Sequence, residues 1–139
     1  QTIPTGPVTI KLFAMGVTDL SGAYLKVQYN KSKLLYNQTI KGEFFADAQE
    51  PIFFYEHNST EGTITVTTSF LGSDSVAVDG TGSLVEFQFT ATSVGTSTLS
   101  IVRDSTGFTA SDSSISELVG PNDQPIEILG YTDGIIIAQ

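Results

Sequence analysis

The sequence lacks cysteine and tryptophan and contains a single histidine, His57. Without cysteine the chain has no disulfide scaffold, no thiolate metal site and no cysteine nucleophile. With a single histidine, the chain cannot form a metal site made of several histidines, nor any catalytic site that needs a second histidine. Because His57 stands between Glu56 and Asn58 in an apparent turn, we expect it to be a solvated loop residue.

Charged residues are also scarce, at 15% of the chain, and the formal net charge is −9. Binding to nucleic acid or to an anionic membrane needs clustered lysine and arginine, so both are excluded. No apolar run reaches membrane-span length, which excludes membrane insertion through a helix. The chain begins at Gln1 without a signal peptide, so we expect a processed amino terminus.

The few basic residues are unevenly distributed. Five lysines against one acid give the first 41 residues a charge of +4, and one arginine against 14 acids gives the remainder −13. A face built from the early strands would then attract an acidic partner or the acidic half of a neighbouring copy. The alternative is that acidic loops simply keep a threonine-rich surface soluble.

The main pattern in the sequence is an alternation of apolar and polar side chains, with a period of two residues. Stretches 23–29, 63–70 and 84–91 alternate apolar with polar side chains, which is typical of strands buried on one side. Glycine or asparagine separates many such stretches, as in a sandwich or barrel. We predict an all-β, two-sheet, jelly-roll-like sandwich of about nine strands, forming one domain over residues 1–139. The expected strands lie near 8–15, 23–29, 33–37, 51–55, 63–70, 83–92, 96–103 and 134–138, with a weaker one at 126–131 and one helical turn at 113–118.

Three stretches carry a resemblance to a known family. They are a loop and strand at 16–30, a glycine-rich turn and hairpin at 80–91 and 95–101, and a last strand at 133–137. Their order and spacing over residues 8–137 resemble the cohesin family, sandwich modules that hold dockerin modules on cell-surface scaffolds. The resemblance implies an extracellular or cell-surface setting. At Gly22 and Tyr24 the family usually carries an asparagine and an aspartate that grip the dockerin, and its Tyr-Asp-Pro turn here begins Tyr29-Asn30.

The amino terminus is shorter than that of most family members. Only residues 1–5 precede the first long strand, and Pro4 lacks a backbone N–H for a sheet. A shortened first strand leaves an edge beside the last strand, 135–137, which a strand from another chain would cover. The alternative is that residues 1–5 pair adequately with that edge.

Three of the four asparagines begin an Asn-x-Ser/Thr sequon: Asn30, Asn37 and Asn58. Such sequons accept glycans when they are exposed in a secreted chain. Because 33 of the 139 residues are serine or threonine, about one sequon is expected by chance. The three residues are therefore glycosylation candidates.

We expect no catalytic residues and no enzyme activity. A glycosidase needs two carboxylates about 5–10 Å apart, one with a raised pKa, and no aromatic cleft singles out any pair among the 15 carboxylates. Oxygen-rich loops leave calcium binding open. None has the spacing of a defined calcium loop, so we predict no metal site and no cofactor. These loops contain Ser73-Asp74, Asp79, Asp104-Ser105 and Asn122-Asp123.

Two pairs of adjacent phenylalanines, at positions 44–45 and 53–54, predict exposed aromatic side chains. Adjacent strand residues point to opposite sides, so one member of each pair faces outward unless a loop covers it. Either Phe45 and Phe54 or Phe44 and Phe53 are then candidates for an exposed patch.

These observations favour a non-catalytic module that attaches to a protein partner through one sheet face. The partner is dockerin-like or a neighbouring copy. Tyr24 is expected to be the aromatic anchor and Lys26 the charge that orients an acidic partner, with Glu86 and Gln88 as a flatter second face. The predicted binding residues are Tyr24, Lys26, Gln28, Thr65, Thr67 and Ser69. Two alternatives remain: a glycosylated filament or surface-layer subunit assembled by strand addition, and a carbohydrate-binding module using Tyr24 or Phe54.

Overall fold

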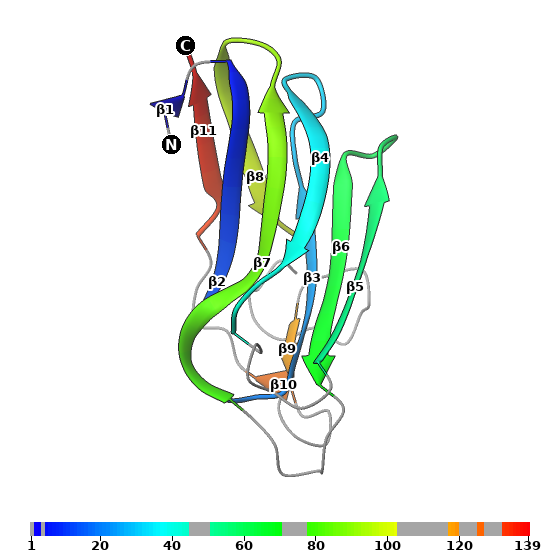
Figure 1. Cartoon of the computed structure of the whole chain (residues 1–139), viewed down its shortest axis with the longest axis vertical. Coiled ribbons are helices and arrows are strands. Elements are labelled where there is room, and N and C mark those ends of the chain that lie inside the picture. Colours follow the sequence, from blue (N-terminus) through cyan, green and yellow to red (C-terminus); the bar gives the residue numbers. More distant parts are fainter. Residues whose placement is uncertain are drawn as a thin grey trace.

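Two stacked β-sheets form the structure, a computed structural model that describes residues 2–3, 5–44, 51–70, 78–102, 117–119, 125–126 and 132–139 (Figure 1). The smaller sheet has the order β2 (Gly6–Leu20), β7 (Val78–Ala91) and β4 (Leu34–Lys41). The larger has the order β1 (Thr2–Ile3), β11 (Gly134–Ala138), β8 (Gly95–Ile101), β3 (Gly22–Gln28), β6 (Thr63–Phe70) and β5 (Pro51–Asn58). Two short strands extend it, with β9 (Glu117–Val119) paired to β3 and β10 (Pro125–Ile126) paired to β9.

The apolar residues of the alternating strands meet between the two sheets. Leu25 and Val27 of β3 and Ile64 and Val66 of β6 are at most 5% exposed. The central strand of the smaller sheet, β7, contributes Phe87 and Phe89, both fully buried. The predicted two-sheet, all-β sandwich is therefore confirmed, and the two-residue period predicts correctly which side of these strands is buried.

Eight of the predicted strands correspond to β2 through β8 and β11, and several of these are longer than expected. Of the weaker strand predicted at 126–131, residue 126 lies in β10, and residues 127–131 lie outside the described residues. β2 continues to Leu20 because irregular pairing with β7 accommodates register shifts after Leu12, Ala14 and Val17. Gly16, with φ of +60°, takes a left-handed conformation there that glycine adopts readily. Its N–H donates to the Thr81 hydroxyl over 2.9 Å, which holds the bulged segment against β7.

The prediction of a helical turn over residues 113–118 is wrong for residues 117 and 118. Residues 113–116 lie outside the described residues, but Glu117 and Leu118 belong to β9. Leu118 is paired with Ala23 of β3 and is 8% exposed. Pairing with an available sheet edge satisfies the backbone groups and buries the leucine, which overrides a weak local helical preference.

In the described part of the chain, no helix has the length and hydrophobicity needed to span a membrane.

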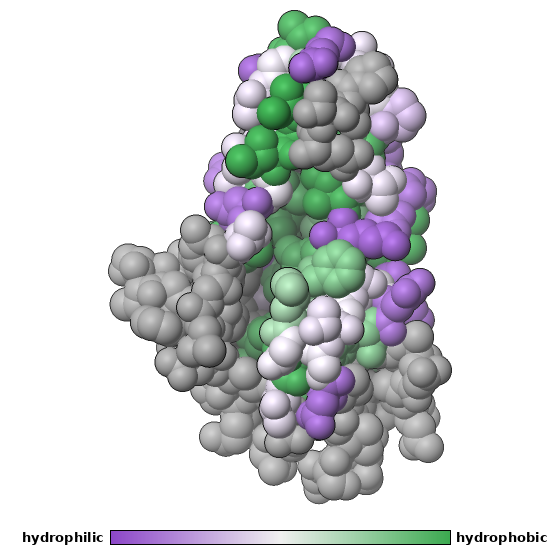
Figure 2. Space-filling model, turned by 90° about the vertical axis from the view of Figure 1, so that its left-hand side faces the viewer, coloured by the Kyte–Doolittle hydropathy of each residue, from purple (hydrophilic) through white to green (hydrophobic). Residues whose placement is uncertain are grey.

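Strand β1 pairs with the last strand, β11, as one of the two alternatives predicted. Thr2 and Ile3 of β1 run parallel to Ile137 and Ala138 of β11. The side of the molecule that shows this region has apolar side chains gathered along its upper and middle parts, bordered by hydrophilic ones (Figure 2). The exposed large apolar side chains of these two described strands are Phe13 and Met15 of β2, at 53% and 77%, and Ile135 and Ile137 of β11, at 53% and 37%.

Candidate functional site

The six predicted binding residues lie on one side of the larger sheet. β3 and β6 are antiparallel, and their register places Tyr24 opposite Thr67 and Lys26 opposite Thr65. Directly opposed residues of antiparallel strands point to the same side. The intervening pair, Leu25 and Val66, is buried in the core, so the alternate residues point outward. We call this surface the β3–β6 face: Tyr24, Lys26, Gln28, Thr65, Thr67 and Ser69.

Strand β5 extends the β3–β6 face by one more strand. Phe54 is opposite Thr67, so Tyr24, Thr67 and Phe54 form one row across three strands. Glu56 is opposite Thr65 and places a carboxylate in the same row as Lys26. Phe54 is 68% exposed, whereas Phe53 packs against the core. The reading in which Phe54 points outward is therefore confirmed, and its predicted companion Phe45 lies outside the described residues.

Strands β8 and β11 extend the same outward side in the other direction. Ser100 is opposite Gln28, and Ile135 is opposite Thr98. Ile135 therefore shares a side with Thr98, while Ile136 between the two exposed isoleucines is 1% exposed. These isoleucines were not among the predicted surface residues. Three consecutive isoleucines contain no polar residue to reveal which way each one points.

Hydrogen-bonding groups on the β3–β6 face are largely unused by the protein. Tyr24, Gln28, Thr65 and Thr67 make no side-chain hydrogen bond anywhere in the described part of the chain. Lys26 does have a partner. Exposed hydroxyl and amide groups in this state bond to water, and a protein partner can replace that water at little enthalpic cost.

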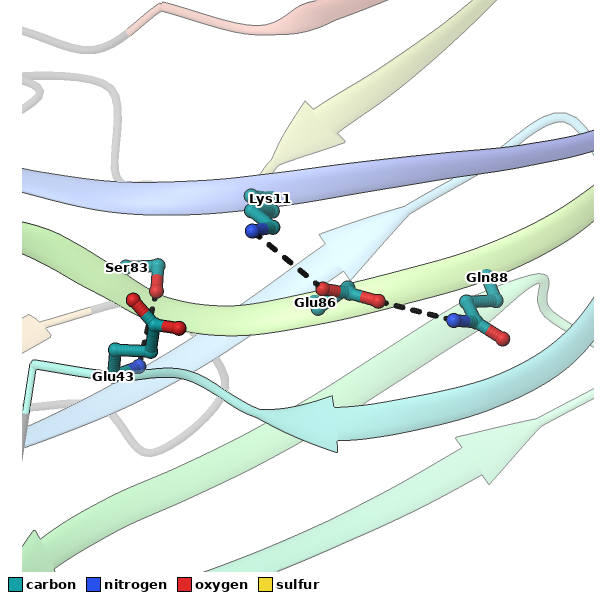
Figure 3. Close-up of polar contacts among 5 residues, drawn as sticks. All are labelled: Lys11, Glu43, Ser83, Glu86 and Gln88. Carbon is teal, nitrogen blue, oxygen red and sulfur yellow. Dashed lines mark hydrogen bonds and ion pairs between the residues drawn. The ribbon is translucent and has the colours of Figure 1, made fainter. Parts of the chain in front are cut away.

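The outward side of the smaller sheet is different, because its polar groups bond to one another. Lys11 Nζ lies 3.9 Å from Glu86 Oε2, and Gln88 Nε2 donates to Glu86 Oε1 over 3.0 Å (Figure 3). Gln38 Nε2 in turn donates to Gln88 Oε1. Glu86 and Gln88 therefore do point outward, as predicted for the second face. They form a ladder from β2 through β7 to β4 whose groups already have partners.

A hollow of about 450 Å³ lies at one end of this ladder. Its lining includes the rings of Phe13 and Phe44 and the charged residues Lys11, Glu43 and Asp79. Phe44 covers Gly82 so closely that a Cβ there would lie 2.7 Å from the ring. The backbone N–H of Glu43 donates a hydrogen bond of 3.0 Å to the Ser83 hydroxyl (Figure 3). Within the described residues no three histidine, cysteine or acidic side chains gather in a group suited to a metal ion.

The prediction that His57 is a solvated loop residue is wrong, because His57 lies within β5. Its register partner Ile64 is fully buried, so the ring points inward between the two sheets. The ring stacks on Tyr36 at 4.0 Å, and Nε2 shares a 2.7 Å hydrogen bond with the Tyr29 hydroxyl. Burial lowers the pKa of His57 and raises the pKa values of Tyr29 and Tyr36. His57 is thus a structural residue that joins β3, β4 and β5.

The early lysines do not form one basic face. β2 and β4 belong to the smaller sheet and β3 to the larger, so Lys11 and Lys26 lie on opposite sides of the sandwich. Lys31 and Lys33 lie in the turn between β3 and β4, where they donate to the backbone carbonyls of Thr60 and Thr96. On the β3–β6 face, Lys26 stands in one row with the carboxylate of Glu56.

The three sequon asparagines take different positions. Asn30 follows β3, Asn58 ends β5, and Asn37 lies within β4. The turns that contain Asn30 and Asn58 lie at the same end of the sandwich, at the top of Figure 1.

Comparisons with known proteins agree with this architecture. The family model described as Cohesin domain matches residues 4–128. No curated protein matches the sequence. A type II cohesin domain from the cellulosome of Acetivibrio cellulolyticus is 17% identical, with a TM-score of 0.79 over 97% of this chain and 88% of that one.

Two further solved structures are similar. A non-cellulosomal cohesin from the hyperthermophilic archaeon Archaeoglobus fulgidus is 13% identical, with a TM-score of 0.72 over 99% of this chain and 84% of that one. A cohesin of Acetivibrio cellulolyticus, solved in complex with the ScaB dockerin, is 14% identical, with a TM-score of 0.73 over 99% and 92%. At these identities the likeness shows a shared fold.

Proposed function

The chain belongs to the cohesin family, and we propose that it is a non-catalytic attachment module that binds a dockerin-like protein through the β3–β6 face. Similar cohesins have been solved in complex with dockerins, which supports a partner of this kind. We further propose that binding takes place outside the cell or at its surface, where the family's scaffolds act.

The observation that carries the choice of face is the contrast in hydrogen bonding between the two outward surfaces. In the described part of the chain, the hydroxyl groups of Tyr24, Thr65 and Thr67 are free of side-chain partners, whereas Gln88 and Glu86 on the other side are bonded to each other. A partner at the second surface would have to break those bonds, and an unpaired buried polar group costs about 1–3 kcal/mol. Tyr24, Thr65 and Thr67 of the β3–β6 face carry no such cost, whereas Lys26 already has a partner.

The apolar and charged groups of this face define the partner further. Phe54, at 68% exposure, is the largest apolar side chain in the central rows and acts as an anchor when covered. Lys26 and Glu56, on either side of Thr65, orient a partner that carries both signs of charge. Gly22 is buried and has no side chain, and Tyr24 has a neutral hydroxyl. The partner therefore meets no carboxylate at either position.

A charge inserted into the middle of the face tests the proposal. Thr67→Arg places a long cation between Tyr24 and Phe54, and Thr9→Arg places the same cation on the outward side of β2. We expect Thr67→Arg to weaken binding by at least about 100-fold, since it blocks the anchor row and adds an unpaired charge to the interface. Thr9→Arg should change affinity less than about twofold.

The probes are the dockerin modules encoded in the same genome, measured by calorimetry against the wild-type chain. If none binds at micromolar concentration, or if Thr9→Arg is the damaging variant, the proposed function or the proposed face is wrong. Light scattering of the unmodified chain separates attachment from the alternative of a strand-adding filament. A concentration-independent monomer supports attachment, and concentration-dependent polymers support the filament.

A further inference from the structure

The structure presents the three sequons to solvent in very different ways. A sequon is usable in a folded protein when its asparagine amide and the hydroxyl two residues later are both accessible, as in surface loops of secreted proteins. We propose that Asn58 is a site of N-linked glycosylation in the folded protein and that Asn37 is not. The proposal is independent of partner binding.

In the Asn58 sequon, both the asparagine amide and the Thr60 hydroxyl are accessible. It spans the last residue of β5 and the turn that leads to β6, and Asn58, Ser59 and Thr60 are all exposed. The Asn58 Oδ1 accepts hydrogen bonds of 3.1 Å from the Thr60 and Glu61 N–H groups, which fixes the side chain. Within the described residues, its Nδ2 and the Thr60 hydroxyl make no hydrogen bond. The amide nitrogen is thus held in position and directed at solvent with no competing partner.

The Asn37 sequon is closed by the fold. Asn37 is exposed, but its Nδ2 donates to the Thr90 hydroxyl over 2.9 Å. Thr39 is only 7% exposed, and its hydroxyl hydrogen-bonds the Tyr36 hydroxyl at 2.8 Å. Both flanking segments are paired with β7, so the backbone cannot be lifted from the sheet without breaking the β4–β7 ladder. A transferase would have to unfold this strand to reach the site.

Asn30 falls between these two cases. It is half-buried, and its Oδ1 accepts hydrogen bonds from both the N–H and the hydroxyl of Ser32, at 3.0 and 2.6 Å. The hydroxyl that a transferase must recognise is therefore held against the acceptor's own side chain. We expect little transfer to Asn30.

The reaction needs a lipid-phosphate-linked oligosaccharide as the sugar donor. Asn58 Nδ2 forms a bond to the anomeric carbon of the sugar and loses a proton. The bond from that carbon to the phosphate oxygen breaks, and the lipid phosphate leaves with the electron pair. The chain contributes only the amide and the hydroxyl that present the acceptor.

The resulting glycan would stand at one end of the β3–β6 face. Asn58 is in the row of Thr63 and Gln28, whereas Phe54 is in the row of Thr67 and Tyr24. These rows are four residues apart along β5, or about 13 Å. The centre of the face therefore stays open, and a partner approaching it would have the sugar at its margin.

Trypsin separates the three sites, because cleavage after the lysines and Arg103 places Asn30, Asn37 and Asn58 in peptides 27–31, 34–41 and 42–103. The protein is isolated from the cells that produce it, and these peptides are analysed by mass spectrometry with fragmentation. We expect a glycan on Asn58 and an unmodified 34–41 peptide. An unmodified Asn58, or a glycan on Asn37, would overturn the proposal.

Two variants made in the same cells confirm the assignment. Thr60→Ala removes the recognised hydroxyl but keeps the backbone N–H that bonds Asn58, so the turn is preserved and the glycan should be lost. Ser59→Ala changes the neighbouring exposed residue and leaves the sequon intact, so the glycan should remain. The free 34–41 peptide is then offered to the cells' own transferase with its lipid-linked donor. Its modification is expected, and failure to modify it would show that folding is not what protects Asn37.

Discussion

Replacing Phe89 by alanine tests whether the alternating pattern places a dry core between the sheets. Phe89 is fully buried on the central strand of the smaller sheet. Its ring lies 5.1 Å from that of Tyr29, 6.2 Å from that of Tyr36 and 6.4 Å from that of Phe87. Truncation removes one buried ring and three aromatic contacts, and a Phe→Ala change in a packed core costs about 3–5 kcal/mol. We expect a loss of about 4 kcal/mol, a large part of the 5–15 kcal/mol typical of a domain.

The matched control is Phe54→Ala, the same chemical change on the opposite side of the larger sheet. Because Phe54 is 68% exposed, its truncation should alter the free energy of unfolding by less than about 0.5 kcal/mol. Unfolding entropy of about 2.1 cal/mol/K per residue corresponds, for this chain length, to about 3.5 °C per kcal/mol. Phe89→Ala should therefore lower the Tm by about 14 °C, while Phe54→Ala should leave it nearly unchanged.

Chemical and thermal denaturation followed by circular dichroism measures both variants. If the two truncations destabilise the protein equally, the assignment of inner and outer sides is wrong. A Phe89→Ala variant as stable as the wild type would show that the space between the sheets is not close-packed.

Other substitutions test individual contacts between neighbouring strands. Burial lowers the pKa of His57 below the 6.5 expected in the unfolded chain, so its contribution to stability is present above about pH 6.5 and is lost as pH falls through the folded pKa. Urea midpoints between pH 7.5 and 5.5 should fall in the wild type and fall less in His57→Phe, whereas equal slopes would refute the assignment. Gly42→Ala should destabilise by about 1–3 kcal/mol, because the new Cβ collides with the Ser83 carbonyl beside the 3.1 Å Gly42–Leu84 hydrogen bond. Gly134→Ala, whose Cβ would lie 3.7 Å from Leu99, is the control, and a smaller effect at Gly42 than at Gly134 would contradict this.

Strand sidedness was predictable wherever polar and apolar residues alternate. Leu25 and Val66 are buried and Lys26 and Thr65 are not, as the period of two requires. The six residues expected to form one face do so because β3 and β6 are neighbours with matching register. The sequence contains the sidedness of each strand, but which strands become neighbours depends on packing of the whole chain.

Sidedness was unpredictable where alternation fails. Residues 52–55 are all apolar or aromatic, so nothing in the sequence distinguishes the outward Phe54 from the inward Phe53. The same holds for the isoleucines of β11. Thr68 is the opposite case, a polar residue that is 2% exposed on an otherwise alternating strand. Threonine is β-branched and suits strands on either side, so its presence does not report exposure.

His57 shows a second limit of local reasoning. Its neighbours Glu56 and Asn58 are polar, which suggested a turn. The contacts that hold the ring come from Tyr29 and Tyr36, which are more than 20 positions away in the sequence. A half-buried histidine between two tyrosines is visible only once β3, β4 and β5 are placed together. The division of the early lysines between both sides of the sandwich has the same origin.

The contrast between the two outward surfaces separates stability from binding. On the smaller sheet the groups of Gln38, Gln88 and Glu86 bond within the chain, so a substitution there changes the free energy of folding even when no partner is present. On the β3–β6 face, Thr65 and Thr67 have no side-chain partners among the described residues, so folding is indifferent to their hydroxyls. We therefore expect loss of either hydroxyl to affect the proposed complex more than the free energy of unfolding. A face whose polar groups bond only to water in the free protein can vary its partner without loss of the fold, which is what an attachment module requires.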